Sequence, residues 1–194
     1  RQDEQLLDAI SAIAATQLEN AQLYEDQKTT LESFVGTLAS TIDARDPLTA
    51  GHSNRISLYS DEIAKMINLP QKRREILRYA ALLHDYGKIA IREAILCKNG
   101  SLSMDEYCHI QEHATFTKNI LKKIHFSRDF KEVPKIAASH HEKMNGSGYP
   151  EGLIGDQIPI ESRILAVSDV FDALTSKRHY RDRMEFENVM DIMM

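Results

Sequence analysis

Apolar residues recur at alternating spacings of three and four along the first forty residues of the chain. No proline occurs there, and Gly36 is the one glycine in the stretch. This spacing is typical of one long helix with a coiled-coil-like seam. The seam positions are Leu7, Ile10, Ala14, Gln17, Ala21, Tyr24, Lys28, Leu31, Val35 and Leu38.

A seam of this kind needs a partner surface. The helix could fold back onto its own domain, or two copies of the chain could pair in parallel. A forty-residue stalk has little else to pack against, so we predict a homodimer through this helix. Residues 1–40 are therefore expected to form a linker or dimerisation helix.

The stretch "DARDPLTAGHSNR" ends the seam, because Pro47 and Gly51 break a helix. Thr49 or Ser53 can cap the helix that follows. Further helical patterns cover residues 73–89, 103–124, 131–142 and 160–180, and residues 145–159 form a Gly/Pro-rich loop. Since no segment alternates long enough to require a sheet, residues 41–194 are predicted to form one all-α domain.

The composition describes an ordinary globular chain: 194 residues, 42% hydrophobic, 27% charged, with a net charge of -5. The negative charge disfavours binding to a nucleic-acid polymer. No secretory signal and no twenty-residue apolar span occurs, which predicts a cytoplasmic protein without a membrane span. Cys97 and Cys108 show no CxxC spacing, and we expect reduced packing residues rather than a disulfide.

The motif "LLHDYGK" places His84 and Asp85 at the end of an apolar run, with Lys88 three residues after the aspartate. If the helix persists through Gly87, His84 and Lys88 share one face. An imidazole beside a carboxylate can hold one divalent ion or bridge two. A His-Asp dipeptide alone is weak support, because it also occurs as an ordinary helix-ending pair.

Other ligand-type residues accompany this pair. Six of the eight histidines lie beside such residues in helix-adjacent positions, although His109 is read as a surface residue, and His125 and His179 as surface or packing residues. The six are His52, His84, His109, His113, His140 and His141.

Asp169 and Asp172 interrupt the otherwise apolar helix "AVSDVFDALTS". A lone buried carboxylate is costly unless it binds a cation or a partner. Asp169 is therefore a ligand candidate, and Asp172 could also accept a hydrogen bond from a ligand imidazole. Glu142 is interpreted as a salt-bridge residue or an indirect support of the site rather than as a catalytic acid.

Four motifs in this order resemble the HD-GYP domain, a bacterial branch of the HD phosphohydrolase superfamily. They are "DARDPLTAGHS", "LLHDYGKI", "HHEKMNGSGYPEGLIGDQIP" and "RILAVSDVFDALTSKRHYR". The resemblance implies an HD-superfamily helical fold and metal-dependent hydrolysis of cyclic di-GMP to pGpG or GMP by a metal-activated hydroxide. It also implies iron or manganese ions and signalling partners that bind through the GYP loop.

Carried over by motif, Asp85 would bridge the ions and act in catalysis together with Lys88. Lys88, Arg178 and Arg181 would contact substrate phosphates, and the loop of Gly148, Tyr149 and Pro150 would shape the wall beside the metals, with glycines that let the backbone approach the substrate. The ligands implied by the resemblance are His52, His84, Asp85, His113, His140, His141 and Asp169.

The sequence departs from the family pattern at a few positions. Leu48 stands where some members carry a glutamate that completes a third metal site, so we predict two ions. Lys143, Met144 and Asn145 replace a common Arg-Trp-Asp stretch, and Tyr86 replaces an aliphatic residue. We expect these replacements to affect base stacking and substrate fit, but not the metal site.

The N-terminal helix resembles the last helix of a GAF sensory domain, and the family usually continues beyond residue 194, so we expect a fragment of a longer protein. Alternative functions are a phosphohydrolase for another cyclic dinucleotide or a nucleotide, and a non-catalytic module that binds cyclic di-GMP or recruits partners.

Overall fold

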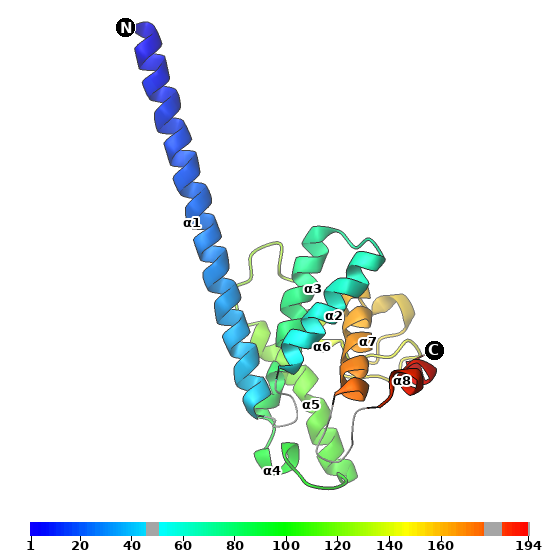
Figure 1. Ribbon diagram of the computed structural model, residues 1–194. Coiled ribbons are helices and arrows are strands. Elements are labelled where there is room, and N and C mark those ends of the chain that lie inside the picture. Colours follow the sequence, from blue (N-terminus) through cyan, green and yellow to red (C-terminus); the bar gives the residue numbers. More distant parts are fainter. Residues whose placement is uncertain (46–50, 177–183, 194) are drawn as a thin grey trace. The chain divides into compact units, whose positions relative to one another are not determined.

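A computed structural model describes residues 1–45, 51–176 and 184–193. These residues form helices joined by loops, with one isolated antiparallel bridge between Asn145 and Ile154. The predicted all-α fold is confirmed. The α-helices are α1 (Gln2–Arg45), α2 (His52–Met66), α3 (Gln71–Leu83), α4 (Glu93–Leu96), α5 (Met104–Leu121), α6 (Val133–Ala138), α7 (Ile160–Thr175) and α8 (Phe186–Met193), with 3-10 helices η1 (Tyr86–Ala90) and η2 (Gly155–Gln157) (Figure 1).

The chain divides into two compact units, Arg1–Thr37 and Leu38–Met194. Unit 1 is the N-terminal part of α1, and its apolar seam residues, such as Leu7, Ile10 and Tyr24, are exposed within the single chain. Because α1 runs without a break from Gln2 to Arg45, the predicted long helix is confirmed. Among the described helices, none combines the length and apolar composition that a membrane crossing requires.

The core of unit 2 lies where α2, α3 and α7 pack together (Figure 1). Its central side chains are aliphatic and fully buried, which gives the hydrophobic driving force for this packing. They are Ile56 and Ala64 of α2, Leu77 and Ala81 of α3, and Ile164 and Leu165 of α7.

A buried polar contact also joins two of the core helices. Ser60 Oγ of α2 donates to Ser168 Oγ of α7 at 2.9 Å, and Ser168 Oγ donates to the carbonyl of Ile164 at 3.0 Å. Small side chains with satisfied hydroxyls let these helices approach closely without leaving an unpaired polar group. The same two helices carry predicted ligands at positions 52 and 169.

Several predicted helices are shorter in the structure than the patterns indicate. The helix that leads into the His-Asp pair ends at Leu83, and η1 follows from Tyr86, so His84 and Lys88 do not share an α-helical face. The segment before the paired histidines is helical only over Val133–Ala138, which leaves His140 and His141 in the turn after α6. His84, His140 and His141 therefore lie just after the ends of helices rather than along their sides.

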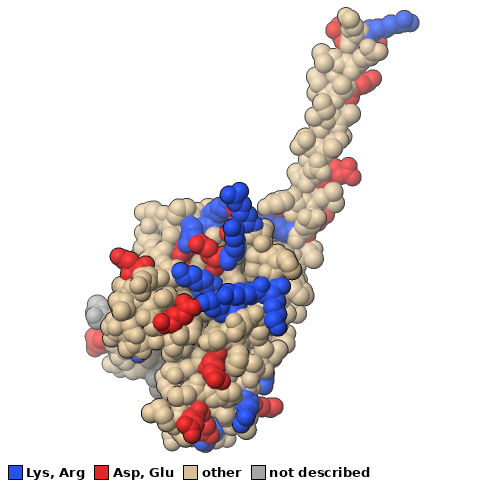
Figure 2. Space-filling view, turned by 180° about the vertical axis from the view of Figure 1, so that it is seen from behind, with Lys and Arg blue, Asp and Glu red and all other residues tan. Residues whose placement is uncertain are grey.

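Charged side chains on the outside are largely mixed in sign. On the face in Figure 2, Lys and Arg side chains gather on one part of the surface, with Asp and Glu side chains interspersed. Many described charges are paired, such as Arg74 with Asp61 at 2.9 Å and Lys72 with Asp129 at 2.6 Å. Exposed pairs of this kind each stabilise the fold by at most about 1 kcal/mol.

Candidate metal centre

All seven predicted metal ligands come together in unit 2. They fall into three overlapping groups whose ligand atoms lie within 4.8 Å of one another inside each group. The groups are His113 with His140 and His141; His52 with His84 and Asp169; and His84 with Asp85 and His140. Helices α2, α5 and α7, the segment between α3 and η1, and the turn after α6 thus deliver nitrogen and oxygen donors to one place.

Asp85 lies between the other donors. Its Oδ2 is 3.4 Å from His84 Nε2 and 3.7 Å from His52 Nε2, whereas its Oδ1 is 3.4 Å from His113 Nε2. One carboxylate therefore turns one oxygen toward each side of the cluster. This is the geometry that a bridging carboxylate between two cations requires.

Three of the imidazoles are oriented by their own chain segment. In His84, His113 and His140, Nδ1 donates to the backbone carbonyl three residues earlier, at 2.7, 2.7 and 2.6 Å. A hydrogen bond at Nδ1 fixes the tautomer and leaves the Nε2 lone pair for a cation. The Nε2 atoms of His113 and His140 lie 3.5 Å apart, so both point into the cluster.

His52 is oriented in a different way. It is the first residue of α2, so it has no preceding helical carbonyl to accept from its ring. Its Nδ1 donates instead to Asp172 Oδ2 of α7 at 2.8 Å, and its Nε2 lies 3.4 Å from Asp169 Oδ1. The hypothesis that Asp172 accepts from a ligand imidazole agrees with this contact.

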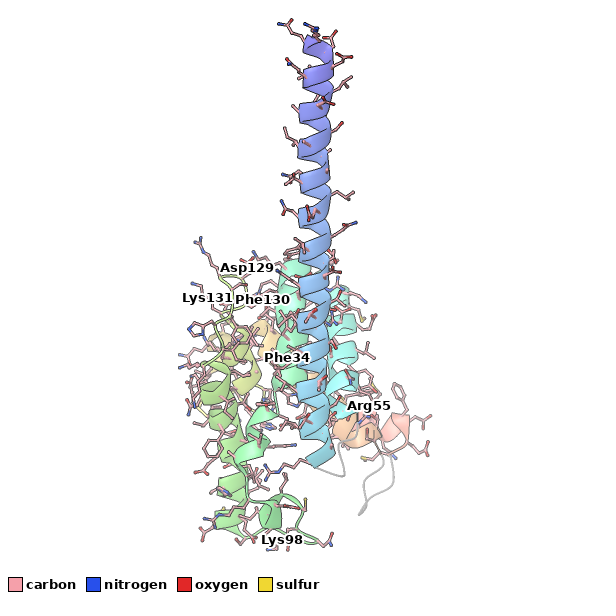
Figure 3. All side chains as sticks on the ribbon, turned by 90° about the vertical axis from the view of Figure 1, so that its left-hand side faces the viewer. Phe34, Arg55, Lys98, Asp129, Phe130 and Lys131 are labelled. Atoms are coloured by element: carbon pink, nitrogen blue, oxygen red, sulfur yellow. The ribbon has the colours of Figure 1, made fainter. Side chains whose placement is uncertain are left out.

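Arg55, labelled in Figure 3, lies one turn after His52 on α2 and holds Asp172 in place. Its Nε donates to Asp172 Oδ1 at 2.6 Å and its Nη2 donates to Asp172 Oδ2 at 2.9 Å. Burial raises the pKa of Asp172, but the hydrogen bonds from His52 and Arg55 outweigh burial and keep this pKa well below its usual range. Asp172 is therefore a carboxylate at neutral pH, which suits an acceptor from the His52 ring.

The electrostatics around His84 call for positive charge. Burial lowers the pKa of His84, yet the neighbouring carboxylate of Asp85 raises it more strongly, to about 9. Nε2 of this fully buried ring makes no hydrogen bond. A buried nitrogen aimed at two carboxylates without a partner is suited to a cation ligand.

Three other imidazoles are held neutral. Burial lowers the pKa of His113, and burial together with the nearby His141 lowers the pKa of His140 well below its usual range. Burial and the neighbouring His113 lower the pKa of His141 to about 4. Because only neutral imidazole binds a metal ion, these three rings are ready to act as ligands at neutral pH.

The donor set fits divalent cations. Five imidazoles and two carboxylates, without a thiolate, form a set that suits first-row metals such as iron and manganese. The buried, unpaired nitrogen of His84 and the opposed oxygens of Asp85 match this chemistry. The residues present therefore fit the metal ions that the sequence analysis anticipates.

Gly87 lets the His-Asp segment lie directly against α5. A Cβ at this position would come within 2.0 Å of the carbonyl oxygen of His113 and 2.5 Å of the backbone nitrogen of Thr117. Thr117 Oγ1 accepts from Gly87 N at 2.8 Å and donates to the carbonyl of His84 at 2.9 Å. This contact fixes the separation between the His-Asp pair and His113.

The loop after the paired histidines is braced by Glu142. The buried carboxylate accepts from the backbone nitrogen of Glu151 at 2.7 Å and from that of Leu153 at 2.9 Å. Lys118 of α5 pairs with the carboxylate of Glu151, which adds a second anchor. Glu142 therefore supports the loop through backbone amides, and its interpretation as a salt-bridge residue finds no such contact among the described residues.

Gly148 and Tyr149 pack against the histidine turn itself. A Cβ on Gly148 would lie 2.3 Å from Lys143 N and 2.5 Å from the carbonyl oxygen of His141, so a backbone approach within the loop demands this glycine. The ring centroid of Tyr149 lies 4.7 Å from that of His141. Tyr149 thus lies beside the predicted ligand His141, and the wall that the loop through Pro150 would form stays a prediction.

Lys88 is the described cation nearest to the bridging carboxylate. Its Nζ lies 2.7 Å from Asp85 Oδ2, although η1 rather than an α-helix carries it. Arg178 and Arg181, predicted to contact substrate phosphates, lie outside the described residues, as does Leu48. Their predicted roles stay predictions.

Some side chains outside the cluster differ from expectation. Cys97 and Cys108 are free, as predicted, but both are exposed, so their reading as packing residues is wrong. His125 is exposed, in agreement with a surface role. His109 is only partly exposed, and its Nδ1 lies 2.7 Å from Glu112 Oε2. His179 lies outside the described residues.

Two supporting residues were not found from the sequence: Arg55 and Thr117. Arg55 lies 117 residues from its partner Asp172, and no local pattern links two such positions. One signal was available, because a buried carboxylate that orients an imidazole needs a cationic partner, and Arg55 follows His52 by three residues. Thr117 gives no comparable signal.

Comparison with known proteins identifies relatives of this chain. A family model described as an HD domain matches residues 36–194. The chain is 42% identical to the 3'3'-cGAMP-specific phosphodiesterase 3 of Vibrio cholerae over 163 residues, which cover 84% of this chain and 35% of the relative. It is 41% identical to the cyclic di-GMP phosphodiesterase response regulator RpfG of Xanthomonas campestris over 145 residues, covering 75% of this chain and 38% of the relative.

A solved structure is similar as well. It is the cyclic GMP-AMP specific phosphodiesterase V-cGAP3 of V. cholerae, with a TM-score of 0.50 and 36% identity, covering 84% of this chain and 36% of that one. The chain thus spans little more than a third of the length of the relatives that it matches. With its four motifs, its helical fold and this family match, the chain belongs to the HD domain family and contains an HD-GYP domain.

Proposed function

We propose that this chain is the hydrolytic domain of a metal-dependent cyclic dinucleotide phosphodiesterase. The observation that carries the proposal is the convergence of the predicted ligands around Asp85, whose two carboxylate oxygens face His84 and His113. The names of the relatives, which are phosphodiesterases for cyclic di-GMP and for 3'3'-cGAMP, supply the substrate class.

We propose two divalent ions, iron or manganese, one on each side of Asp85. His113, His140 and His141 would hold one ion, and His52, His84 and Asp169 would hold the other. When bound, such a pair of ions lowers the pKa of a water molecule and neutralises charge on a phosphoryl group. The protein fixes the two sets of donors at a set separation, because Gly87 and Thr117 lock the His-Asp segment onto α5.

The residues around the ligands would bind and orient the substrate. The Lys88 ammonium lies beside Asp85 and would attract a phosphate of the incoming anion. Tyr149, packed on His141, would limit the site on one side and keep water away from it. Arg178 and Arg181 would add positive charge at the substrate.

Cyclic di-GMP is the substrate that we predict from the motifs, with linear pGpG or GMP as product. A second candidate is 3'3'-cGAMP, which differs by one purine base, because that substrate is in the name of the 42% identical relative. Lys143, Met144 and Asn145 replace the common Arg-Trp-Asp stretch beside the loop. Recognition of the bases would therefore determine which of the two dinucleotides is preferred.

The test is an anaerobic assay of iron- or manganese-reconstituted protein with both dinucleotides, resolving linear and mononucleotide products over time. Turnover that Asp85→Ala abolishes would support the proposal, and the faster substrate would name the specificity. Binding of either dinucleotide without cleavage by the metal-loaded chain would contradict it and would favour a binding module.

We further propose that two copies pair through the N-terminal part of α1. The support is the row of exposed apolar residues at heptad-like spacing, including Leu7, Ile10, Tyr24 and Leu31. Sedimentation at several concentrations should show a dimer that Ile10→Asp weakens, whereas Gln22→Glu, outside the seam positions, should leave it unchanged. A monomer at all concentrations would contradict the proposal. The predicted cytoplasmic location stays a prediction.

A further inference from the structure

The first turn of α2, which carries His52, is capped from another helix. Gly51 occupies the N-cap position with a φ of 70°, and no local side chain caps the turn. Ser53 is not the cap that its sequence position suggests. Its backbone nitrogen donates to Asp43 Oδ2 at 3.2 Å, and its hydroxyl donates to Asp43 Oδ1 at 2.7 Å.

Asp43 belongs to the last turn of α1, inside unit 2. Its side chain is buried with an exposed fraction of 4%, and that of Ser53 is 1%. A carboxylate at the N-terminus of a helix accepts from free backbone amides and favours the positive end of the helix dipole. Asp43 thus fixes the first turn of α2, in which the predicted ligand His52 is the first residue.

Arg45, two residues further along the same turn, reaches the other ligand segment. Its Nη1 donates to the carbonyl of Lys88 at 3.2 Å and also contacts that of Ile89, and its Nη2 donates to the carbonyl of Ile91 at 2.7 Å. Lys88 and Ile89 belong to the last turn of η1 and Ile91 directly follows it, so the arginine side chain binds the carbonyls at the end of this helix. Lys88 in turn places its ammonium 2.7 Å from Asp85.

One turn of α1 is therefore bonded to two segments that flank the bridging carboxylate. The geometry points to a role for Asp43 and Arg45 as positioning residues: Asp43 sets His52 for its cation, and Arg45 sets Lys88 for the substrate phosphate. Neither residue lies within the ligand groups, and each acts through another residue. The inference rests on the proposed function of the metal centre, and it makes the last turn of α1, which belongs to unit 2, a support of the site.

Titration of metal-free protein with Mn²⁺, followed by electron paramagnetic resonance, tests the Asp43 arm. Asp43→Asn keeps the shape of the side chain but loses one acceptor oxygen. We expect about 10-fold weaker binding of one of two Mn²⁺ ions and an unchanged second ion, because support of a ligand imidazole is worth about 10-fold or more in affinity. Ser53→Ala removes only the hydroxyl donor and should weaken the same ion by about 3-fold.

Asp61→Asn is the matched control on the same helix. Asp61 accepts from Arg74 Nε at 2.9 Å and Nη2 at 3.1 Å, so the substitution weakens an ion pair of α2 without touching its first turn. It should lower the melting temperature and leave both Mn²⁺ affinities unchanged. Equal effects of Asp43→Asn and Asp61→Asn on Mn²⁺ binding, or no effect of Asp43→Asn, would overturn the inference.

The Arg45 arm is read from kinetics. Arg45→Gln should raise KM for the cleaved dinucleotide by about 10-fold, with kcat and both Mn²⁺ affinities within 2-fold, and Arg45→Lys should recover part of the loss. A fall in kcat alone would contradict this arm. Wild-type protein that binds two Mn²⁺ ions but cleaves neither dinucleotide would refute the proposed function, while the Mn²⁺ comparison would still decide the role of Asp43.

Discussion

The two halves of the candidate metal centre are built by different means. On the side of His113 and His140, each ring is oriented by a carbonyl three residues earlier in its own segment. His52, on the opposite side, is oriented by Asp172, which lies 120 residues away and is held by Arg55. Local sequence therefore orients His113 and His140, as it also orients His84 beside His52. The orientation of His52 depends instead on how α2, α7 and the end of α1 meet.

This difference predicts how the halves respond to mutation. A backbone carbonyl cannot be removed by a side-chain substitution, so the orientation of His113 and His140 is robust. The orientation of His52 depends on side chains, each of which can be changed singly. Substitutions away from the ligands should therefore affect one ion much more than the other.

The largest effect is expected where the halves share a ligand. Asp85→Ala removes the carboxylate that faces His84 on one side and His113 on the other. We expect turnover to fall by about 10³-fold and the metal content to fall below one ion per chain. Product analysis with metal quantification measures both, and Asp156→Ala, at an exposed carboxylate paired with Arg163, serves as the control. Turnover near the wild-type rate would show that Asp85 bridges nothing.

Gly87→Ala should push the His-Asp segment away from α5, which carries His113. The new Cβ would meet the carbonyl oxygen of His113 at 2.0 Å, where only backbone could give way. We expect a loss of about 3 kcal/mol in the free energy of unfolding, measured by urea denaturation. Gly36→Ala is the matched control, since nothing lies within 4 Å of its Cβ, and it should stabilise α1 by about 0.5–1 kcal/mol. If Gly87→Ala were as harmless as Gly36→Ala, the close contact would be absent in solution.

Asp172→Asn should act on one half alone. The amide cannot serve both His52 and Arg55 as the carboxylate does. We expect one ion to bind about 10- to 100-fold more weakly and the ion at His113, His140 and His141 to keep its affinity. Calorimetric titration of metal-free protein measures both affinities. Equal weakening of both ions would remove the distinction between the halves.

Glu142→Gln tests the wall beside the locally built half. The amide would turn one donor toward the backbone nitrogens of Glu151 and Leu153, which the carboxylate now satisfies. We expect KM to rise by about 10-fold with metal content unchanged, because the loop rather than a ligand is disturbed. A loss of bound metal would show instead that Glu142 supports the ligands directly.

The smallest effect is expected at His109. It lies one turn before His113 on α5, but its ring pairs with Glu112 outside the ligand groups. His109→Gln should change metal affinity and turnover by less than about 2-fold. A clear loss of metal would enlarge the locally built half by one ligand.

Local chemistry explains what could be predicted from the sequence. The all-α fold and the long helix follow from periodicity and are confirmed. The ligand set came from the resemblance, and the structure brings all seven side chains together. Asp172 was identified as a candidate acceptor because a carboxylate in an apolar helix needs a partner.

The remaining features depend on contacts that no local pattern carries. The close approach of Gly87 to α5, just after α3 ends at Leu83, joins positions 26 or more residues apart and leaves no local signal. The role of Asp43 could not be predicted for a similar reason. Ser53 is a residue type that often caps a helix, yet its hydroxyl donates to Asp43. Arg55 and Asp43, which support His52 through Asp172 and Ser53, are thus the least predictable part of the site.

The most direct test of the central claim counts ions in single-ligand variants. Metal-free wild type, His141→Ala and Asp169→Ala are loaded with Mn²⁺ under identical conditions, and bound metal per chain is measured together with circular dichroism as a check of folding. We predict two ions for wild type and one for each folded variant, because each substitution removes a ligand from one side of Asp85 only. Two ions bound in both variants, or no Mn²⁺ bound by the wild type, would contradict a centre of two ligand groups on either side of Asp85.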